Sequence, residues 1–581
     1  MAVNNSIRLE ANNNITLAAG ANIATSGTGS IRFTADADNS GAGTLAMNNA
    51  TLSSDIGGIA LAGASVSGTG AINSTGGTSG NGGNVSITTT AGNVGVGAIT
   101  SSGGTAAAGT AGRNAGNVTV SSAGTVTTGA ITASGSAGNG ATLDLAGGNG
   151  AAISITGVGG VTTGILAASG ANATTTNGKG GDAGSISIGN SGSGNISTNR
   201  LTAATGAATG TGAGGSVGFI SVVNTAAGGS VSTNIISTLG ANNAGGGDVL
   251  LSAQGDVTVA GTIGTSAGSN SSGGPGRKAG NITISGVNRS ISGVMTANGG
   301  IASGTNKAAG GAGIVSVTGS GTLSTAGINS RTGTATGIGA GGTVGGITWA
   351  AAPSPPGTAR HQRPRERRRR QHQHHCQWPA DPQRGPAQHG RGERGRDHAG
   401  RQQRWCDQRV RQRDHLGRGG DDHGQWRCRT GHQPGRWQRG ALVTITGTGT
   451  GAIALNTAAA ITSSTGAATG TGAGGAVGGI VLGGPSITST GALTTTGGVN
   501  GNGGNVSITT TAGNVGVGAI TSSGGTAAAG TAGRNAGNVT VSSAGTVTTG
   551  AITASGSAGN GATLDLAGAT ARRSPSPASA G

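Results

Sequence analysis

Residues Gly280 to Gly300, GNITISGVNRSISGVMTANGG, contain the pattern that decides the fold. Apolar residues alternate at Ile282 and Ile284, a Gly-Val-Asn turn follows, and a second pair of β-prone segments carries Ile291 and Met295. Alternation in runs of about three to five residues, rich in Ile, Val and Thr and bounded by Gly and Asn, is typical of short strands and not of helices. The stretch therefore predicts a unit built from several short strands.

The same pattern recurs at steps of about 33 residues, a period typical of a solenoid rather than a globule. The first apolar residues of successive units are Val85, Val118, Ile153, Ile186, Ile220, Val249, Ile282, Val315 and Ile347. Shorter units in residues 1 to 80 start at Ile7, Ile31 and Ile59. Because strands this short cannot bury a core alone, we expect each unit to stack on the next. The residues expected to be buried in one unit are Val85, Ile87, Val94 and Ile99.

These observations predict an all-β fold, a repetitive parallel β-helix with Gly-rich loops. A coil of about twenty residues would form each turn, and the Gly-rich remainder, such as Thr105 to Gly116, would loop out at one edge. The composition of 127 Gly, two Phe and no Tyr suits a narrow interior filled by Val, Ile, Leu and Ala better than a bulky core. Disorder is the alternative for a chain rich in Gly, Ser and Thr, but the regular apolar alternation argues against it.

Composition divides the chain into four parts. They are the β-helix repeats 1–349, a basic Arg/His/Gln-rich segment 350–440, further β-helix repeats 441–568, and a tail 569–581. Residues 501–568 are identical to residues 80–147, which indicates a recent duplication. The basic segment contains all nine His, the three cysteines Cys376, Cys406 and Cys428, and most of the Lys and Arg behind the formal net charge of +17.

A shift of the reading frame explains the basic segment and the tail. With inferred codons, a one-base shift converts Arg, Gln, His, Trp and Cys into the Gly, Asn, Ser, Thr and Ala of the repeats. His361 to Trp378 then becomes similar to Thr78 to Asn93, and the tail matches the continuation of the first copy from Gly148. The distance from Ile347 to Val443 corresponds to three repeats, so three repeats are predicted to be hidden there. As written, residues 350–440 are predicted to be disordered.

The sequence predicts no catalytic residue, cofactor site or metal site, and the protein is not expected to be an enzyme. The acids of the repeats are sparse, and Asp36 and Asp38, the one close pair, are interpreted as part of a solvated turn rather than an acid/base couple. The three cysteines contain no CxxC pair, so a zinc site is not predicted. If residues 351–440 were genuine, their Arg-rich composition would indicate nucleic-acid binding, but no specific nucleic acid is expected.

The repeat N-[VI]-x-[VI]-x-x-x-G-x-[VI]-x-x-G-x-[IL]-x-[AST]-x-G occurs with small departures at Asn84, Asn117, Asp248 and Asn281. It resembles the repeats of the filamentous haemagglutinin family of large bacterial exoproteins, and passenger domains of autotransporters share it. The resemblance implies export by an outer-membrane secretion partner and a location outside the cell or on the outer membrane of a Gram-negative bacterium. It also implies a β-helix that adheres to host-cell or abiotic surfaces. The chain lacks the family's Asn-Pro-Asn-Gly motif, its opening does not resemble a signal peptide, and no apolar run is long enough for a membrane span.

We therefore expect a fragment of an adhesin, a structural stalk that displays loops such as Gly268 to Gly280 and Gly299 to Gly313. Its expected partners are unidentified surface receptors and further copies of itself. The alternatives are a non-functional pseudogene fragment and a polysaccharide-acting β-helix enzyme, in addition to the nucleic-acid-binding protein considered above. An enzyme of that kind would need carboxylates clustered on neighbouring coils.

Overall fold

The structure is a computed structural model that describes residues 4–140, 144–336, 342–343, 347–350, 443–446, 453–455, 460–465 and 478–560. Every regular element in these residues is a β-strand, which confirms the prediction of an all-β fold. The described strands belong to one compact unit, formed by Met1–Pro355 and Gly435–Gly581.

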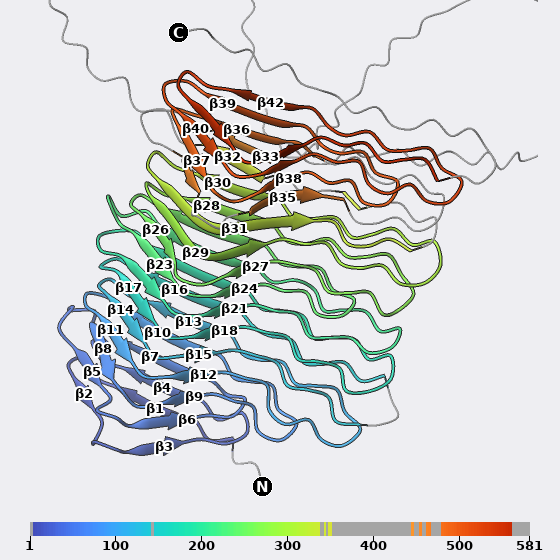
Figure 1. Ribbon diagram of the computed structural model, residues 1–581. Helices are drawn as coiled ribbons and strands as arrows, with labels where there is room; N and C mark the ends of the chain where they lie inside the picture. Colours follow the sequence, from blue (N-terminus) through green and yellow to red (C-terminus); the bar gives the residue numbers. More distant parts are fainter. Residues whose placement is uncertain are drawn as a thin grey trace, which may run out of the picture. The chain divides into compact units, whose positions relative to one another are not determined.

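Most coils contain three short strands, as the coil that begins at Val85 illustrates (Figure 1). It consists of β10 (Val85–Thr89), β11 (Val94–Val96) and β12 (Ile99–Thr100). The next coil consists of β13 (Val118–Ser121), β14 (Val126–Thr128) and β15 (Ile131–Thr132). Each strand pairs in parallel with the strand at the same place in the next coil, β10 with β13, β11 with β14 and β12 with β15. The described coils therefore form a parallel β-solenoid.

The first strands of the coils form one sheet of sixteen strands. Its other members are, in order around β10 and β13, β1 (Ile7–Glu10), β4 (Ile31–Thr34), β7 (Ile59–Gly63), β16 (Ile153–Gly157), β19 (Ile186–Asn190), β22 (Ile220–Asn224), β25 (Val249–Ala253), β28 (Ile282–Ser285), β30 (Val315–Thr318), β32 (Ile347–Ala350), β33 (Val443–Thr446), β36 (Ile480–Gly484), β39 (Val506–Thr510) and β42 (Val539–Ser542).

The second and third strands of the coils form a sheet of 24 strands and a separate sheet of four. At the second position lie β2 (Ile15–Thr16), β5 (Thr44–Ala46), β8 (Ser65–Gly68), β17 (Val161–Thr163), β20 (Ile196–Thr198), β23 (Val231–Thr233) and β26 (Val257–Val259). At the third lie β3 (Asn22–Ala24), β6 (Thr51–Ser53), β9 (Ile72–Asn73), β18 (Leu166–Ala167), β21 (Leu201–Thr202), β24 (Ile236–Ser237), β27 (Ile263–Gly264), β35 (Ala460–Ser464), β38 (Leu493–Thr494), β41 (Ile520–Thr521) and β44 (Ile552–Thr553). The longer strands β29 (Arg289–Thr296) and β31 (Leu323–Arg331) cover both positions, and the four-stranded sheet contains β34 (Ile453–Leu455), β37 (Ile487–Ser489), β40 (Val515–Val517) and β43 (Val547–Thr549).

The predicted starts of the units are the first residues of strands in the sixteen-stranded sheet. Val85 is the register partner of Val118, Val118 that of Ile153, and the same alignment continues through every predicted start to Ile347. The shorter units align in the same way, with Ile7 beside Ile31 and Ile31 beside Ile59. The sequence therefore predicted both the period and the register.

The interior of the coils is a set of apolar ladders, because alternate residues of each strand point inward. Val85, Ile87, Val94 and Ile99 are at most 1% exposed, as predicted. Burial of one such side chain contributes roughly 1.5–3 kcal/mol. Each coil covers the next, so stability accumulates along the stack.

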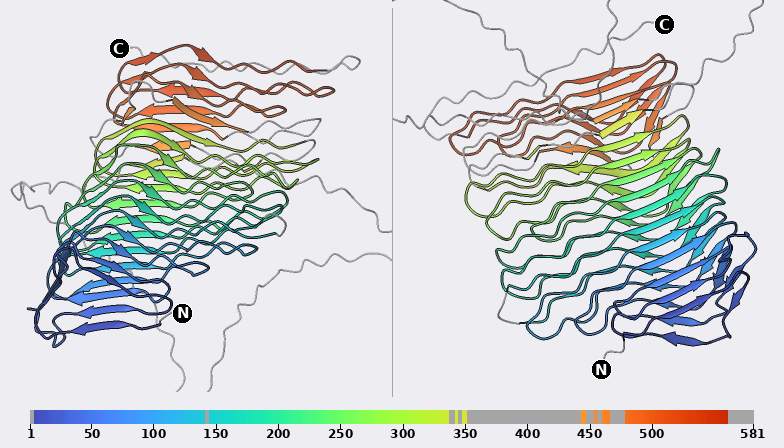
Figure 2. Two further views of the ribbon diagram at one scale, coloured as in Figure 1. Left: turned by 90° about the horizontal axis from the view of Figure 1, so that it is seen from below. Right: turned by 180° about the vertical axis from the view of Figure 1, so that it is seen from behind.

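The Gly-rich remainder of each unit leaves the coil after its third strand as an extended loop, and these extensions lie side by side along one edge (Figure 2). The two legs of an extension bond to each other and to the next coil, as in Gly116 N to Ser101 O (2.8 Å) and Gly103 N to Ser134 O (3.0 Å). The legs approach so closely that a Cβ on Gly103 would lie 2.0 Å from the carbonyl oxygen of Arg113. Glycine is required there by packing between backbones.

Strands β32 and β33 meet directly, although about ninety residues separate them in sequence. Ile347 is the register partner of Val443, so no repeat intervenes between these two coils in the chain as written. The three repeats predicted to be hidden in residues 351–440 lie outside the described residues. The basic segment and the tail 569–581 lie outside the described residues.

Candidate functional site

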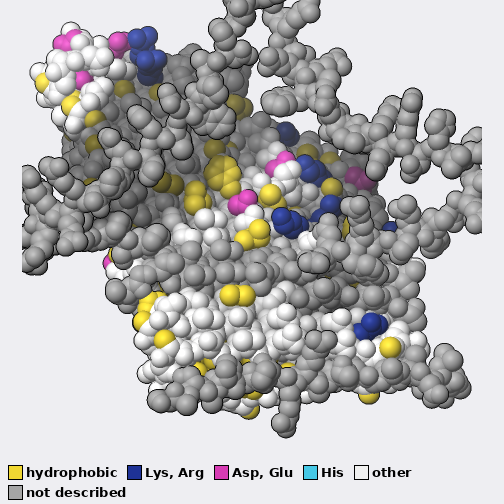
Figure 3. Space-filling model, turned by 90° about the horizontal axis from the view of Figure 1, so that it is seen from above, with side chains coloured by type: hydrophobic (Ala, Val, Ile, Leu, Met, Phe, Trp, Pro, Cys, Tyr) yellow, Lys and Arg dark blue, Asp and Glu magenta, His cyan; other side chains and the backbone are white. Residues whose placement is uncertain are grey.

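The outer face of the sixteen-stranded sheet is rich in hydroxyl groups. From β10 to β22, the residues Ser86, Thr119, Ser154, Ser187 and Ser221 occupy one register position in consecutive coils. Strands of a sheet are about 4.8 Å apart, so the hydroxyl groups form a regular row. On the side drawn in Figure 3, the described surface is mainly neither apolar nor charged.

Asparagine and aspartate side chains connect consecutive coils at the corners. Oδ1 of each accepts a hydrogen bond from the backbone N–H one coil further on. In one such series, with the accepting residue first and the residue whose N–H donates second, the pairs are Asn81 and Asn114 (3.0 Å), Asn114 and Asn149 (2.8 Å), Asn149 and Asp182 (2.8 Å), and Asp182 and Ser216 (2.6 Å). The acids Asp55, Asp248 and Asp256 also accept backbone N–H groups of neighbouring coils. These side chains satisfy backbone N–H donors of the neighbouring coil, in segments that precede strands.

Asp36 is buried, which corrects the interpretation of its loop as a solvated turn. Its side chain accepts hydrogen bonds from Ser40 Oγ (2.9 Å), Gly41 N (2.9 Å), Thr90 Oγ1 (3.1 Å) and Ala42 N (3.4 Å). Burial by itself would raise the pKa of the Asp36 carboxyl group, but these hydrogen bonds outweigh burial and lower the pKa below its ordinary value. The signal that the sequence lacked is Thr90, which reaches Asp36 from a later coil.

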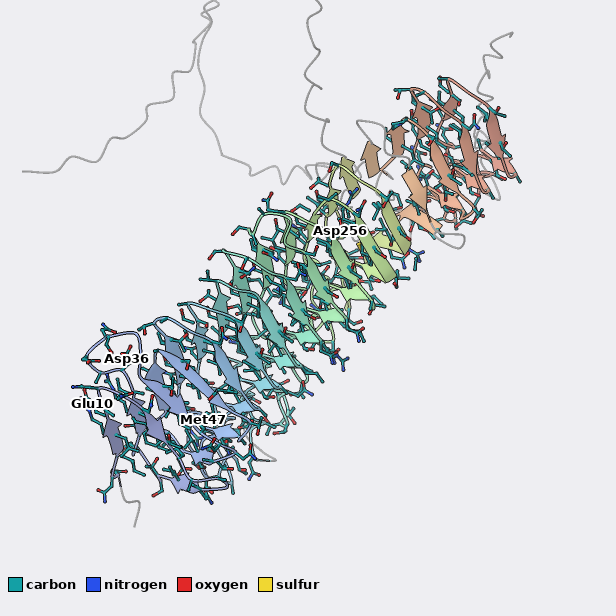
Figure 4. All side chains as sticks on the ribbon, turned by 90° about the vertical axis from the view of Figure 1, so that its left-hand side faces the viewer. Glu10, Asp36, Met47 and Asp256 are labelled. Atoms are coloured by element: carbon teal, nitrogen blue, oxygen red, sulfur yellow. The ribbon has the colours of Figure 1, made fainter. Side chains whose placement is uncertain are left out.

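The described carboxylates do not gather into a catalytic or metal site. Asp38 accepts the N–H of Ser40 (3.3 Å), and Glu10 pairs with Arg8 on the same strand. Figure 4 shows Asp256 many coils away from Glu10 and Asp36. Within the described ranges, no group of three or more His, Cys, Asp or Glu residues is placed to hold a metal ion.

A second charged residue is buried in the described coils, and sequence reasoning did not single it out. Arg289, the first residue of β29, is the register partner of Val257 in the preceding coil and of Leu323 in the following coil. Its side chain occupies the inward position of an otherwise apolar ladder and is only 3% exposed. Burial lowers the pKa of the guanidinium to about 10, while the charge of Asp256 acts in the opposite direction.

Arg289 takes the place of a polar side chain that some of the other coils have at the same corner. In those coils an inward residue directly before the corner donates to a backbone carbonyl of the turn, as Thr89 does to Gly92 O (2.7 Å) and Asn224 to Ser230 O (3.0 Å). The corners after β28 and β30 have Gly286 and Gly319 at this position.

The guanidinium lies against the second of these glycines, Gly319. Nη1 of Arg289 donates to the carbonyl oxygens of Val287 and of Gly321 (3.1 Å). A Cβ on Gly319 would lie 2.4 Å from Nη1 and 2.7 Å from Cζ. Nε is buried and has no partner among the described residues.

A groove of about 460 Å³ lies at the surface of this corner. It is lined by Ala253, Gln254, Ser285, Gly286, Val287, Thr318, Gly319 and Ser320. Three consecutive coils contribute to it, because these residues end or directly follow β25, β28 and β30. The corner groove, defined by these eight residues, is the candidate binding site of the described chain.

Comparison with protein-family models, with curated proteins and with solved structures finds no match to this chain. The fold and the site define its class as a parallel β-solenoid repeat protein. Among the residues that the structure describes, none forms a helix long and apolar enough to cross a membrane.

Proposed function

We propose that this chain is part of a bacterial surface adhesin, in which the β-solenoid is a stalk that displays its extensions. The observation that carries the proposal is the repetition of extensions at one edge of the stack, coil after coil (Figure 2). Many similar loops held on a rigid scaffold can each bind weakly and together give high avidity.

The proposal includes a location on the outer membrane or outside the cell, export by an outer-membrane secretion partner, and association with further copies. It rests on the resemblance of the repeats at Asn84, Asn117, Asp248 and Asn281 to those of filamentous haemagglutinin.

A structural rather than catalytic role is part of the proposal. Asp55, Asp182, Asp248 and Asp256 each accept a backbone N–H of a neighbouring coil, so their carboxylates stabilise the stack. A glycoside hydrolase needs two carboxyl groups facing one bond of the substrate.

To test the proposal, the full chain is displayed on a non-adherent bacterium through an outer-membrane anchor. The cells that attach to epithelial monolayers and to glass are then counted. We expect more attachment than with the anchor alone, and attachment should rise steeply with the density of displayed chains because avidity depends on simultaneous contacts. A Thr305→Glu/Lys307→Glu variant changes exposed residues of one extension, and Ser86→Ala changes an exposed residue of the coil as its control. Attachment no greater than with the anchor alone would contradict the proposal.

A further inference from the structure

The outer face of the sixteen-stranded sheet contains an apolar patch, defined by Val217, Phe219 and Leu250. Their side chains are 47, 49 and 38% exposed, respectively. Leu250 is the second residue of β25, and Phe219 directly precedes β22. Ile220 and Val249, the first residues of β22 and β25, are buried, and successive side chains of an extended chain point to opposite faces. Phe219 and Leu250 therefore point outward, and Val217, two residues before Phe219, lies on the same side.

The patch departs from the pattern of the neighbouring coils. Phe219 lies between Ser185 of the preceding coil and Asp248 of the following coil. Leu250 interrupts a row of hydroxyl groups. The residues that share its register position from β10 to β30 are Ser86, Thr119, Ser154, Ser187, Ser221, Thr283 and Ser316. Exposed apolar side chains that are grouped and surrounded by polar ones mark interaction sites.

The position of the patch and the size of the face fit a large, flat partner. In the order of the sheet, β22 and β25 are the eighth and ninth of its sixteen strands. The strands of this sheet from β7 to β30 contain no charged residue. Each strand offers roughly 65 Å² of outer face, for a spacing of about 4.8 Å and four residues of about 3.3 Å. A stable interface buries about 800 Å² on each partner, so about twelve strands are sufficient.

We propose that two copies of this chain pair through this face, with the apolar patch of each copy at the centre of the contact. The inference rests on the association with further copies that the proposed function includes, and it identifies the surface. A hydroxyl group both donates and accepts hydrogen bonds, so a face covered by hydroxyl groups is complementary to itself. A two-fold contact uses the same surface on both partners, and a patch at the middle of that surface meets its own copy. The result is an apolar centre with a polar rim, as in stable interfaces.

Asp248 is the charged residue beside the patch. It is exposed, and its Oδ1 accepts the N–H of Asn281 (2.7 Å). Two-fold pairing brings Asp248 of both copies near the centre of the contact, where their like charges oppose association. Asparagine occupies the equivalent position before β10, β13 and β28, as Asn84, Asn117 and Asn281. Asp248→Asn therefore removes the charge and keeps the acceptor.

The test is sedimentation equilibrium of the full chain at several concentrations, where we expect a monomer–dimer equilibrium. Phe219→Ser/Leu250→Ser should raise the dimer Kd by about tenfold or more, because anchors at the centre of an interface carry most of its binding energy. Serine occupies both equivalent positions in the preceding coil, as Ser185 and Ser221, so this variant should fold.

Two further variants sharpen the test. Asp248→Asn should lower the Kd by roughly two- to fivefold, the range of exposed charge pairs. Ile165→Ser is the matched control, because Ile165 is also exposed (45%) but lies between β17 and β18 and not on this face. It should leave the Kd unchanged.

Salt concentration separates this contact from ionic association. The central strands of the face are uncharged, so high salt should not weaken the dimer and should screen the repulsion between the two Asp248 side chains. A dimer lost at high salt would point to contact through the Arg-rich residues 350–440 and would overturn the proposal.

Three other results would also overturn it. They are a chain that stays monomeric, an unchanged Kd in Phe219→Ser/Leu250→Ser, and a monomer that binds phosphatidylcholine vesicles through the patch, since a membrane would then be the occupant. The measurement is made on the soluble chain without any surface. A monomeric chain would therefore refute the pairing alone, and a failure to attach cells would leave the pairing intact.

Discussion

The two identical copies, residues 80–147 and 501–568, form the same strands but differ in burial at their last described coil. The equivalent inward residues are Val118, Val126 and Ile131 in the first copy, which are 0, 1 and 0% exposed, and Val539, Val547 and Ile552 in the second, which are 7, 46 and 50% exposed. In the first copy β16, β17 and β18 cover these residues. In the second copy no described strand lies beyond β42, β43 and β44.

One coil earlier, the two copies agree. Ile87 and Ile508 are both fully buried, and so are Ile99 and Ile520, because each of them has a coil on both sides. The comparison teaches that burial in this fold is decided by the neighbouring coil and not by the residue's own sequence. Four predictions test this conclusion.

The largest difference in lost stability between the two copies is expected when a charged side chain is placed at an inward position of each copy. Val126→Asp should destabilise its coil by roughly 3–5 kcal/mol, because the carboxylate would be buried without a partner. Val547→Asp should cost less than about 1 kcal/mol, because this position is half exposed. Native-state hydrogen exchange of the coil amides measures both values, with the exposed Thr127→Asp and Thr548→Asp as controls. Equal losses in the two copies would contradict the role of the neighbouring coil.

Truncation of an inward isoleucine should also destabilise the first copy more than the second, but the difference in lost stability between the copies should be smaller than for the charge. Ile131→Ala should cost about 2–5 kcal/mol, since the cavity would be closed on both sides by neighbouring coils. Ile552→Ala should cost less than about half of that, because water already reaches the side chain. Hydrogen exchange of β15 and β44 measures the two losses, and a larger loss at Ile552 would refute the comparison.

Removal of a buried hydroxyl group at the base of the extensions should destabilise both copies equally. Ser101 Oγ donates to Gly83 O (2.6 Å), and Ser522 Oγ donates to Gly504 O (2.7 Å). Because both serines are fully buried, Ser101→Ala and Ser522→Ala should each cost about 1 kcal/mol. Exposed Ser86→Ala should stay within about 0.5 kcal/mol. A clear inequality between the two buried serines would show that the copies differ beyond their last coil.

Low pH should destabilise the first coils of the chain but not the two copies. Asp36 has a lowered pKa in the folded state, so its stabilisation is present above the ordinary aspartate pKa and is lost as the pH falls through the lowered value. The described strands of the two copies contain no carboxylate and should keep their protection. Hydrogen exchange between about pH 5 and pH 2 measures this, and Asp36→Asn should remove the pH dependence of the first coils. Equal acid sensitivity of the copies would contradict this prediction.

Most of the fold could be predicted from sequence because every repeat has the same pattern of apolar residues. An apolar residue every second position, restarted about every 33 residues, indicates both which side chains point inward and which residues become neighbours. The alignment from Val85 to Ile347 therefore followed from counting. Counting did not reveal that Ile347 would meet Val443 directly, because their separation in the sequence was taken to correspond to three repeats.

The candidate groove could not be predicted in the same way. Nothing in the sequence distinguishes Arg289 from an exposed arginine, and the glycines at positions 286 and 319 resemble the others of the repeats. The groove exists because residues of three coils come together when the coils stack, and the guanidinium lies where a Cβ on Gly319 would be. Asp36 is similar, since its partner Thr90 is supplied by a later coil.

The sequence by itself determined the class of fold, the period, the register of the first sheet and the edge at which the extensions leave. These properties depend on local alternation and on repetition, which are written along the chain. The tertiary structure alone decided how far the last described coil of each identical segment is buried, where a charge is buried and which residues line a groove. These properties depend on contacts between coils, and the same residue is buried or exposed according to the coil that lies beside it.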